Sequence, residues 1–475
     1  MVPLQRLTDV FAQQRARRWE IGRAPAPTRV EKLRRLKKAI VTHREDLLSA
    51  MHADFRKPRS EAELSELQLV LTELNHAISH LPRWMQTTAV PTPMHMLGTR
   101  SEIRHQPRGV VLILAAWNYP FALLFAPLVA AIAAGNTVML RPSERVPHTN
   151  ALADRILAEA FEESEVALVG GGRETADALL ALPFDHIFFT GSSPVGRAIL
   201  EKASRHLPSV TLELGGKSPA IVDETADVPA AARAVMWGKF VNAGQTCVAP
   251  DYALVHASHV QAFVAESRRA LDTFYGASPE LKAKSGDLCR IIDQASFDRL
   301  SALLDGAVSD GARIETGGDR NAAERYLAPT LLSGVRPTSE IMADEIFGPV
   351  LPILTFTTRA EAAAFVRSRP TPLVLYLFAT GEPAINEILA ATASGGAVIN
   401  NTLIHLLNPD LPFGGAGASG FGAYHGEHGF RSFSHQRSVV YQRKPNLTSL
   451  FHPPYARLRS GLLGKVLAFV RRMRD

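Results

Sequence analysis

A thiol stands among small and polar residues at Cys247, within the stretch NAGQTCVAP (residues 242–250). The chain of 475 residues contains only two cysteines, so the placement is not explained by a general abundance of sulfur. Gly244 lets the backbone approach a ligand closely, while Gln245 and Thr246 supply polar groups beside the thiol. A catalytic cysteine needs access and help in forming its thiolate. The pattern therefore makes Cys247 a candidate nucleophile.

Two further segments carry groups that could act on the same substrate. Glu213, in TLELGGKSP, ends an apolar run between Leu212 and Leu214. Such neighbours desolvate a carboxylate and raise its pKa, which suits a general base near pH 7, although a surface glutamate at a strand end is the alternative. Asn118, in AAWNYPF, follows a predicted buried strand, and its amide could donate to a developing oxyanion. Taken alone, Asn118 is more often a turn residue.

The segment FFTGSSPVGRAIL (residues 188–200) predicts a strand that runs into a glycine turn and then a helix beginning near Val195. Gly191, Ser192 and Gly196 frame this turn. The free backbone N–H groups at the start of such a helix, together with the helix dipole, can face a phosphate. The spacing is not the G-x-G-x-x-G fingerprint, so the segment is a weak signal by itself.

The composition is that of an ordinary soluble globular protein, with 46% hydrophobic and 21% charged residues and a net charge of +6. Basic and acidic residues are interleaved, which argues against nucleic-acid binding. Two cysteines are too few for a disulfide framework or a structural zinc site, so we predict a reducing compartment and no metal. Cys289, in GDLCRIID, is interpreted as a small buried residue. The N-terminus lacks the apolar core of a secretory signal.

The order of the sequence patterns predicts an α/β fold with two doubly wound α/β domains and a small additional β element. Uncharged residues 109–140 are interpreted as a buried strand–helix–strand unit rather than a membrane span. The predicted parts are helices and the first α/β region at 1–87 and 107–208, the second α/β region at 209–398, an extended element at 88–106 and 399–445, and a tail at 446–475.

All of these segments occur together with RPSE (141–144) and EIFGPVLPI (345–353), and in this combination the chain resembles the NAD(P)-dependent aldehyde dehydrogenase superfamily over nearly its whole length. That family places its general-base glutamate 34 residues before its cysteine, and here 247 − 213 = 34. FRKPRSEAELSEL, PLVLYLF, LPFGGAGASGFGAYHGEHGF and SFSHQRSV resemble the class 3 branch, whose members act on fatty, aromatic and coniferyl-type aldehydes.

The resemblance implies a role for each catalytic group. Cys247 would attack the aldehyde, and its backbone N–H together with Asn118 would form the oxyanion hole. Glu213 would activate the water that hydrolyses the thioester. The resemblance also implies a Rossmann-like NAD(P)-binding domain at 1–87 and 107–208, a catalytic domain at 209–398, and an oligomerisation element at 88–106 and 399–445.

The resemblance also assigns the cofactor contacts, with NAD or NADP as the cofactor. Gly191, Ser192 and Gly196 would lie near the pyrophosphate, Arg141 and Glu144 at the adenosine ribose, Glu345 at the nicotinamide ribose, and Phe347 beside the nicotinamide. The family usually has lysine where this chain has Arg141. Arginine replaces a compact ammonium with a planar fork, which leaves the preference between NAD and NADP open and could favour a 2′-phosphate.

Three other functions remain open from the sequence. A dehydrogenase could pass its thioester to coenzyme A, although Glu213 argues against this because such enzymes need no water-activating base. A thiol esterase would use the same cysteine without hydride transfer. A non-catalytic relative is disfavoured because no catalytic position is lost.

The sequence also supports expectations about the C-terminal tail and the oligomeric state. Leu462, Leu463, Val466, Leu467 and Val470 share one face of a predicted basic helix. This helix is too short to span a bilayer, and it fits either an interfacial membrane helix or a helix that packs on protein. A cytoplasmic location, with or without peripheral membrane contact, is expected. The class 3 resemblance implies a homodimer.

Overall fold

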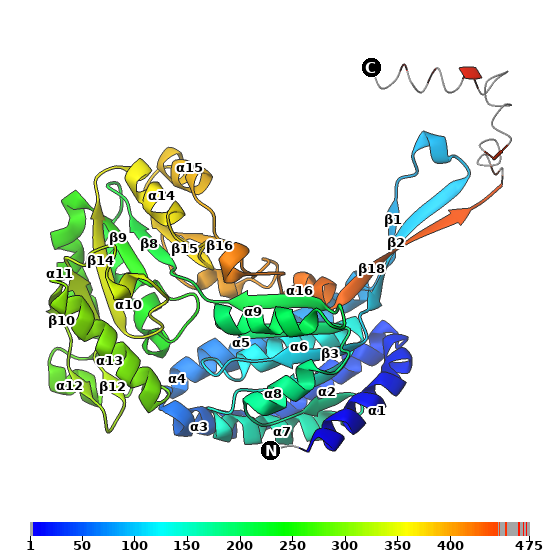
Figure 1. Cartoon of the computed structure of the whole chain (residues 1–475), viewed down its shortest axis with the longest axis horizontal. Coiled ribbons are helices and arrows are strands. Elements are labelled where there is room, and N and C mark those ends of the chain that lie inside the picture. The colour runs from blue at the N-terminus through cyan, green and yellow to red at the C-terminus, as the bar shows by residue number, and fades with distance from the viewer. Residues whose placement is uncertain are drawn as a thin grey trace.

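The computed structural model describes residues 3–444 together with residues 446, 452, 453, 464, 465, 469 and 472 (Figure 1). The predicted N-terminal helices are present: α1 (Leu4–Gly22), α2 (Ala26–Thr42), α3 (Arg44–Phe55), α4 (Arg59–Ala62), a π-helical turn η1 (Glu63–Leu67) and α5 (Gln68–Trp84). A single π turn inserted between two α-helices is often found at functional sites. The segment containing η1 contacts the site described below.

The first α/β region forms a six-stranded sheet with the strand order β17-β7-β6-β3-β4-β5. All neighbours are parallel except β17, which runs antiparallel to β7. The strands are β3 (Val110–Leu114), β4 (Thr137–Arg141), β5 (Val166–Leu168), β6 (His186–Gly191), β7 (Ser209–Leu214) and β17 (Gly420–Phe421), and the helices between them are α6 (Ala122–Ala134), α7 (Pro147–Ala160), α8 (Arg173–Leu180) and α9 (Ser193–Ala203).

Both faces of this sheet are buried, as a parallel sheet requires. On β3, the side chains of Val110, Leu112 and Leu114 pack in a cluster with α1, α8 and α9. Val111 and Ile113 point to the opposite face and join the larger core, which includes α2, α5, α6 and α7. The uncharged segment around α6 is thus a buried βαβ unit, and no helix in the described part of the chain is long and apolar enough to cross a membrane.

A seven-stranded sheet forms the second α/β unit, in the order β10-β13-β14-β9-β8-β15-β16, with only β10 antiparallel. Its strands are β8 (Pro219–Val222), β9 (Tyr252–His256), β10 (Arg313–Thr316), β13 (Thr330–Ser333), β14 (Val350–Phe356), β15 (Val374–Phe378) and β16 (Gly396–Ile399). The helices of this unit are α10 (Val228–Phe240), α11 (Val260–Tyr275), α12 (Pro279–Lys284), α13 (Gln294–Ser309), α14 (Arg359–Arg367) and α15 (Glu382–Ala391). A short hairpin, β11 (Arg320–Asn321) with β12 (Tyr326–Leu327), lies beside α13.

The expected boundary between residues 208 and 209 differs from the sheet that is observed. The strand β7 pairs in parallel with β6 from His186↔Ser209 to Gly191↔Leu214, so it belongs to the first sheet. The second sheet begins only with β8, after the turn at residues 215–218. The sequence pattern could not show this, because an apolar strand carries no mark of the neighbour with which it pairs.

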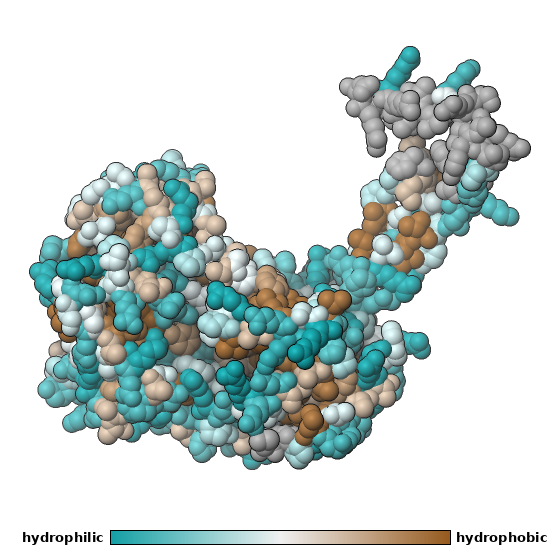
Figure 2. All heavy atoms as spheres, viewed as in Figure 1, coloured by the Kyte–Doolittle hydropathy of each residue, from teal (hydrophilic) through white to brown (hydrophobic). Residues whose placement is uncertain are grey.

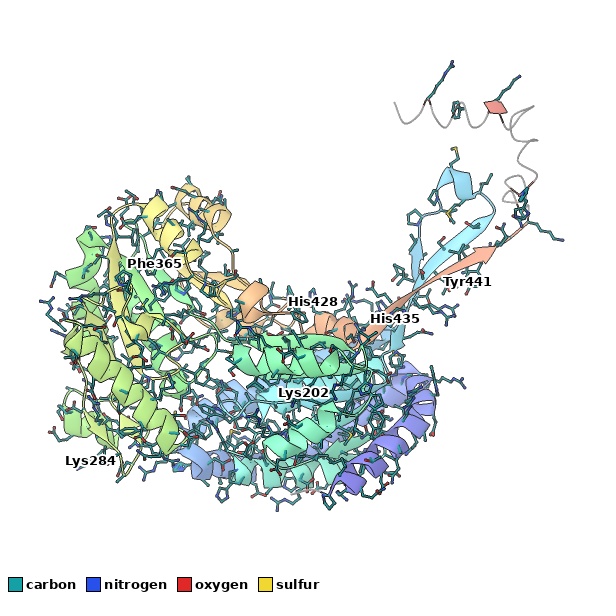
Figure 3. All side chains as sticks on the ribbon, viewed as in Figure 1. Lys202, Lys284, Phe365, His428, His435 and Tyr441 are labelled. Atoms are coloured by element: carbon teal, nitrogen blue, oxygen red, sulfur yellow. The ribbon has the colours of Figure 1, made fainter. Side chains whose placement is uncertain are left out.

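Of the extended element predicted at 88–106 and 399–445, three strands form an antiparallel sheet: β1 (Thr88–Val90), β2 (Thr99–Pro107) and β18 (Ser434–Gln442). Residues 399–433 differ from the prediction, because β17 pairs with β7 and α16 (Gly426–Ser432) packs on α5 and α6. The strand β18 pairs with β2 along its whole length, from Ser434↔Pro107 to Gln442↔Thr99. We call these three strands the arm. Figure 1 shows the arm projecting away from the body, and Figure 3 labels His435 and Tyr441 along β18. The helix predicted around residues 462–470 lies largely outside the described residues.

Candidate active site

The nucleophile follows a backbone turn of unusual conformation. The helix α10 ends at Phe240, and the turn η3 (Val241–Gly244) contains Asn242 and Ala243 with φ of 54° and 50°, followed by Gly244 with φ of 72°. Left-handed non-glycine residues are costly and persist only where surrounding contacts hold them. A Cβ at Gly244 would lie 2.3 Å from the carbonyl oxygen of Gly348, so only glycine fits there.

Asn118 lies against this turn. Its Nδ2 donates to the carbonyl of Gln245 at 3.0 Å, two residues before Cys247. Asn242 donates from its own Nδ2 to the carbonyls of Asn118, at 2.9 Å, and of Gln245, at 3.0 Å. The loop after β3 and the cysteine loop are therefore joined directly. The Asn118 amide has a second N–H that can serve another acceptor.

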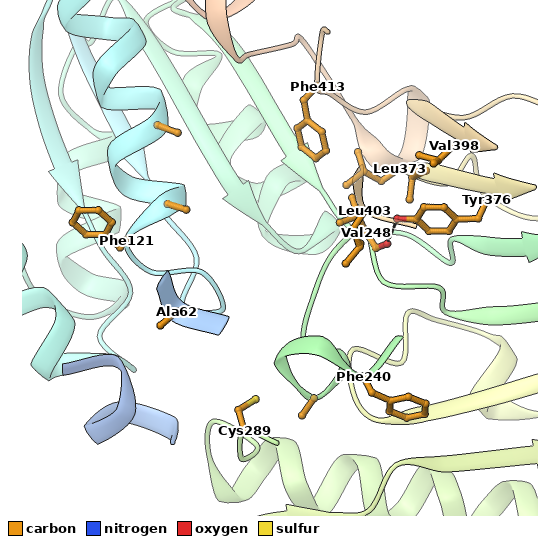
Figure 4. Packing of buried hydrophobic residues seen from close by; sticks show 14 of the residues in the cluster. Ala62, Phe121, Phe240, Val248, Cys289, Leu373, Tyr376, Val398, Leu403 and Phe413 are labelled. Atoms are coloured by element: carbon orange, nitrogen blue, oxygen red, sulfur yellow. Dashed lines mark hydrogen bonds between the residues drawn. The ribbon is translucent and has the colours of Figure 1, made fainter. Parts of the chain in front are cut away.

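Cys289 is buried in the hydrophobic core, as expected, and its thiol also contacts polar groups. Its thiol donates to Asn242 Oδ1 at 3.7 Å. Gln245 packs beside it, donating from Nε2 to the carbonyls of Asn242 and Arg290 and accepting the N–H of Ile292 at Oε1. Figure 4 shows Cys289 near Phe240, the last residue of α10. The second cysteine thus supports the loop that carries the first.

Cys247 and Glu213 line the same cavity, which has a volume of about 590 Å³. Most of its wall is apolar, and it is built from η1, α5, the start of α6, the ends of α10 and α11, the turn η6 (Ile404–Leu407) and the glycine-rich segment before α16 (Gly426–Ser432). The apolar lining includes Leu64, Leu69, Tyr119, Ala122, Leu123, Trp237, Val241, Phe274, Tyr275, Leu373, Leu403, Ile404, Leu406, Leu407, Phe413 and Tyr424. The part of this wall formed by Leu373, Leu403 and Phe413 is seen in Figure 4.

Glu213 occupies the penultimate position of β7 and is only 3% exposed. Both of its carboxylate oxygens are buried without a hydrogen-bond partner among the described residues. Burial raises the pKa of Glu213 well above its usual range. The raised pKa makes the ionised Glu213 a stronger base than an exposed carboxylate, which is the property predicted from its apolar neighbours.

The electrostatics around Cys247 favour the neutral thiol. Burial is the main reason that the pKa of Cys247 is raised to about 12, and the nearby carboxyls of Glu345 and Glu213 add to it. The backbone N–H groups of Cys247 and Val248 oppose this shift. A thiol with so high a pKa needs a base to take its proton as it attacks.

The strand-to-helix turn expected to face a phosphate is present, with one difference. The helix α9 begins at Ser193 rather than near Val195, because Pro194 fits the first turn of a helix. Ser192 precedes the helix and makes no side-chain cap, so the first N–H groups keep their donor capacity. Gly196 packs under Leu214, where a Cβ would lie 2.9 Å from Leu214 Cδ2.

Arg141 and Glu144 lie together at the end of β4. Arg141 donates from Nη2 to Glu144 Oε2 at 2.6 Å and to the carbonyl of Gly171 at 2.8 Å. Its Nε is buried without a partner among the described residues. A guanidinium with spare donor capacity, close to the sheet edge from which α9 starts, suits a nucleotide with ribose hydroxyls and phosphates. The residues present therefore fit the dinucleotide that the sequence predicted.

Glu345 and Phe347, the last two of the predicted cofactor contacts, lie in the loop before β14. Glu345 packs on Gly215, where a Cβ would lie 2.0 Å from its Oε2, and it accepts the N–H of Gly216. Burial, followed by the charge of Asp251, raises the pKa of Glu345 to about 8. Phe347, with φ of 50°, meets Trp117 edge to face at 5.5 Å. Since Trp117 precedes Asn118, this aromatic pair lies next to the cysteine loop.

Sequence reasoning missed a group of charged residues behind these loops. Lys57, Glu61 and Glu66 contact the backbone or rings of the two loops, and Lys217 and Asp251 support the segment that holds Glu345. In the sequence, the segment FRKPRSEAELSEL indicates only a resemblance to the class 3 branch. Its charged residues look like those of any solvated helix, so nothing in the sequence marked them as buried.

Comparisons with known proteins agree with this geometry. A profile of the aldehyde dehydrogenase family matches residues 9–439. The chain is 44% identical to the 4,4′-diaponeurosporen-aldehyde dehydrogenase of Staphylococcus aureus over 90% of this chain and 92% of that protein. It is 39% identical to aldehyde dehydrogenase family 3 member A2 of Macaca fascicularis over 95% and 90%. It is 38% identical to the dimeric NADP-preferring aldehyde dehydrogenase of Canis lupus familiaris over 94% and 97%. The substrate-bound structure of Staphylococcus aureus AldH matches with a TM-score of 0.92 and 41% identity, covering 98% and 99% of the two chains.

The chain therefore belongs to the aldehyde dehydrogenase family, in a class 3-like branch. It is an NAD(P)-dependent oxidoreductase that oxidises aldehydes to carboxylic acids, and the predicted resemblance, α/β fold class and cofactor class are confirmed. The acylating and esterase alternatives are not favoured by these relatives.

Proposed function

We propose that Cys247, Glu213 and Asn118 carry out the reaction in this cavity. Cys247 Sγ attacks the aldehyde carbon as the thiolate, its proton having passed to solvent water, and the carbon–sulfur bond forms as the carbonyl π bond breaks. The carbonyl oxygen becomes an oxyanion, which the free N–H of the Asn118 amide and the N–H of Cys247 stabilise. An oxyanion-hole donor is worth about 3 kcal/mol of barrier in other enzymes. The observation that carries the proposal is that Cys247 and Glu213 line one cavity while Asn118 is bonded to the cysteine loop.

The second half of the reaction is assigned to Glu213. The bound nicotinamide nucleotide supplies the hydride acceptor, and Arg141, Glu144, Glu345, Phe347 and the turn at residues 191–196 would hold it. Oxidation of the adduct leaves a thioester on Cys247. Glu213 then removes a proton from water, the water oxygen adds to the thioester carbon, and the carbon–sulfur bond breaks to release the acid. The unpartnered carboxyl of Glu213 supports this role, because it has no competing hydrogen bond among the described residues.

The substrate class follows from the cavity wall. A volume of about 590 Å³ lies in the range of ligand pockets, which is about 300–1,000 Å³. The lining described above is mainly aliphatic and aromatic, and near its mouth Leu64 is 68% and Leu407 66% exposed. We infer that medium- or long-chain aliphatic aldehydes, or aromatic ones, are preferred, because an apolar tail gains about 25 cal/mol for each Å² that it buries.

Two variants test the assigned roles. Cys247→Ser is expected to abolish NAD(P)H formation from every aldehyde while leaving NAD(P) binding, measured by fluorescence titration, unchanged. Glu213→Gln is expected to give one equivalent of NAD(P)H in a rapid burst and then stall, because the thioester forms but is not hydrolysed. Steady turnover in Glu213→Gln at the parent rate would remove Glu213 from its role. Added coenzyme A serves as a control, since faster turnover with it would favour acyl transfer.

A panel of aldehydes tests the substrate class separately. Straight-chain aldehydes of increasing length, benzaldehyde and cinnamaldehyde are compared with both NAD and NADP. We expect kcat/KM to rise with chain length for the aliphatic series. A preference for acetaldehyde would contradict the inference from the cavity wall.

We infer that the arm mediates a homodimer. Its three strands project from the body (Figure 1) and expose Val90 on β1 and Val440 on β18, and Met94 is exposed in the turn η2 (Met94–Met96) between β1 and β2. Figure 2 shows an apolar patch on the arm. Val440→Lys is expected to shift sedimentation toward the monomer, while Lys284→Glu on α12, which lies far from the arm in Figure 3, is expected not to do so. Monomeric parent protein would contradict the inference.

Peripheral membrane contact through the tail is a second inference about partners, supported by the sequence pattern of residues 462–472. The full chain and a chain ending at Asn446 are compared by co-sedimentation with anionic liposomes. Equal behaviour of the two chains would contradict membrane contact.

A further inference from the structure

A short acidic and basic segment behind the active site contacts both catalytic loops. It comprises residues 57–66, which run from the end of α3 through α4 into the π turn η1. Glu61 Oε1 accepts the backbone N–H of Asn242 at 2.9 Å. Asn242 is the first of the left-handed residues that precede Cys247, so the bond acts on the strained part of the loop.

The same segment holds the other loop through Glu66. Lys57 Nζ lies 2.7 Å from Glu66 Oε1, and both side chains are fully buried. The second oxygen, Glu66 Oε2, accepts the backbone N–H groups of Phe121 and Ala122 at 3.0 and 2.9 Å. These N–H groups belong to the turn that leads from Asn118 into α6, where four N–H groups lack partners within the helix. Glu66 thus fixes the loop that carries the oxyanion donor.

Lys57 links the two loops a second time through an aromatic ring. Its Nζ lies 3.8 Å from the ring centre of Tyr119, which is close enough for a cation–π interaction. The hydroxyl of Tyr119 is 2.8 Å from Thr246 Oγ1, next to Cys247. Residues 57–66 therefore reach the Asn118 loop at its backbone and the Cys247 loop both at its start and near the nucleophile.

Glu61 differs from Lys57 and Glu66 because it also lines the substrate cavity. Burial raises the pKa of Glu61 to about 7, while the charge of Lys57 and the N–H of Asn242 act in the opposite direction. Glu66 and Asp287 are the other charged groups close enough to affect it, and both raise the pKa. Burial removes part of the hydration of the Glu61 carboxylate, so contact with water does not explain its position. Its bond to Asn242 is the interaction that accounts for its placement.

We propose that Glu61 is a positioning residue for the nucleophile: its carboxylate holds the left-handed turn at residues 242–244 and thereby orients Cys247 relative to Asn118. The inference rests on the proposed roles of those two residues. Without the Glu61 acceptor, Asn242 and Ala243 lose one of the contacts that keep them at positive φ, and the turn relaxes toward conformations in which Sγ points elsewhere. Glu61 does not itself touch the reacting atoms.

The experiment compares Glu61→Ala and Glu61→Gln with Glu63→Ala in the full-length protein. Glu63 lies two residues after Glu61, at the start of the π turn η1, and its carboxylate pairs with Arg44 and accepts a hydrogen bond from Gln68, so Glu63→Ala is the matched control. Two rates are measured: alkylation of Cys247 by iodoacetamide, followed by mass spectrometry of its peptide, and the pre-steady-state burst of NAD(P)H. Thermal midpoints and the KM for NAD(P) are recorded for each variant.

We expect Glu61→Ala to lower both rates about tenfold, the effect of losing one hydrogen bond to a charged group, while the KM for NAD(P) changes less than twofold. Glu61→Gln keeps an acceptor oxygen and should recover most of the loss. Should Glu61→Ala fail to fold, Glu61→Asp takes its place, because its carboxylate is one methylene too short to reach Asn242. Rates in Glu61→Ala or Glu61→Asp equal to those of Glu63→Ala would overturn the inference. Such a result with Cys247→Ser inactive leaves the proposed function standing, whereas an active Cys247→Ser overturns the proposed function itself.

Discussion

Two buried lysines face the same carboxylate in this protein, and we expect opposite effects when each is replaced. Lys217 Nζ donates to Asp251 Oδ2 at 2.6 Å and to the carbonyls of Ile341 and Asp344 at 2.9 and 2.8 Å. Lys239 Nζ lies 3.8 Å from Asp251 Oδ1, beyond hydrogen-bond distance, and has no acceptor among the described residues. The Lys217 ammonium thus has an acceptor for each of its three N–H groups, whereas the Lys239 ammonium has none among the described residues. A buried charge is tolerated in a fold only when it is paired and hydrogen-bonded, as Lys217 is.

The size of the effect follows from the pKa of Lys239. Burial is the main reason that this pKa falls from 10.5 to about 8, although Asp251 attracts the proton. One pKa unit corresponds to about 1.36 kcal/mol, so (10.5 − 8) × 1.36 gives about 3 kcal/mol of destabilisation while the amine carries its proton in both states. Methionine fills a similar volume without a charge. Lys239→Met is therefore expected to raise the free energy of unfolding by about 3 kcal/mol at pH 7.

Lys217→Met is expected to do the reverse, because it leaves Asp251 without its hydrogen-bonded partner and frees two carbonyls. Removing one member of a buried pair costs about 3–5 kcal/mol. Urea unfolding at pH 7, followed by tryptophan fluorescence, measures both differences. Lys202→Met serves as the control, since Lys202 lies on α9 at the surface, as labelled in Figure 3.

The pH dependence isolates the amine of Lys239. Its folded-state pKa is lower than its unfolded-state pKa, so between about pH 8 and 10.5 the unfolded chain binds the additional proton. Parent stability therefore rises relative to Lys239→Met across this window, and the advantage of the variant fades. An advantage that stayed constant up to pH 10, or a Lys239→Met protein less stable than its parent, would refute the reasoning.

Two further predictions concern the site itself. Because the pKa of Cys247 is raised to about 12, alkylation of Cys247 without added cofactor should rise about tenfold for each pH unit from 7 to 9, and a plateau near pH 7 in a stopped-flow assay would contradict the raised pKa. Arg141→Lys should lower the ratio of kcat/KM for NADP to that for NAD about tenfold if the guanidinium recognises a 2′-phosphate, and an unchanged ratio with matched concentrations of the two cofactors would show that it does not.

The strands and the shared cavity could be predicted because they depend on local patterns and a general rule. Short β-rich runs gave β3, β4, β5 and β6, and parallel strands in an α/β sheet present their carboxyl ends at one edge, where ligands bind. Glu213 and Asn118 end or follow such strands, but that they act together with Cys247 was implied by the family resemblance, and their joint role stays a prediction.

The supporting contacts could not be predicted, because they join positions that no local pattern connects. Glu61 and Asn242 are 181 residues apart, and Glu66 and Phe121 are 55 apart. In the sequence, Glu61 and Glu66 stand among the charges of an ordinary amphipathic helix. Whether such a carboxylate faces water or a backbone N–H is decided by the packing of α4 and η1 against α6, which is a tertiary event.

Several energetically unfavourable features lie in or near this site. Glu213 and Lys239 are buried without hydrogen-bond partners in the described part of the chain, and Asn242, Ala243 and Phe347 adopt left-handed backbone conformations. Each costs on the order of 1–3 kcal/mol, and the closely packed cores of the two sheets must offset the sum. Substitutions that relax these features should therefore stabilise the fold, and only those at groups outside the reaction, such as Lys239, should do so without loss of activity. Measuring stability and activity for each variant therefore distinguishes groups that take part in the reaction from groups that do not.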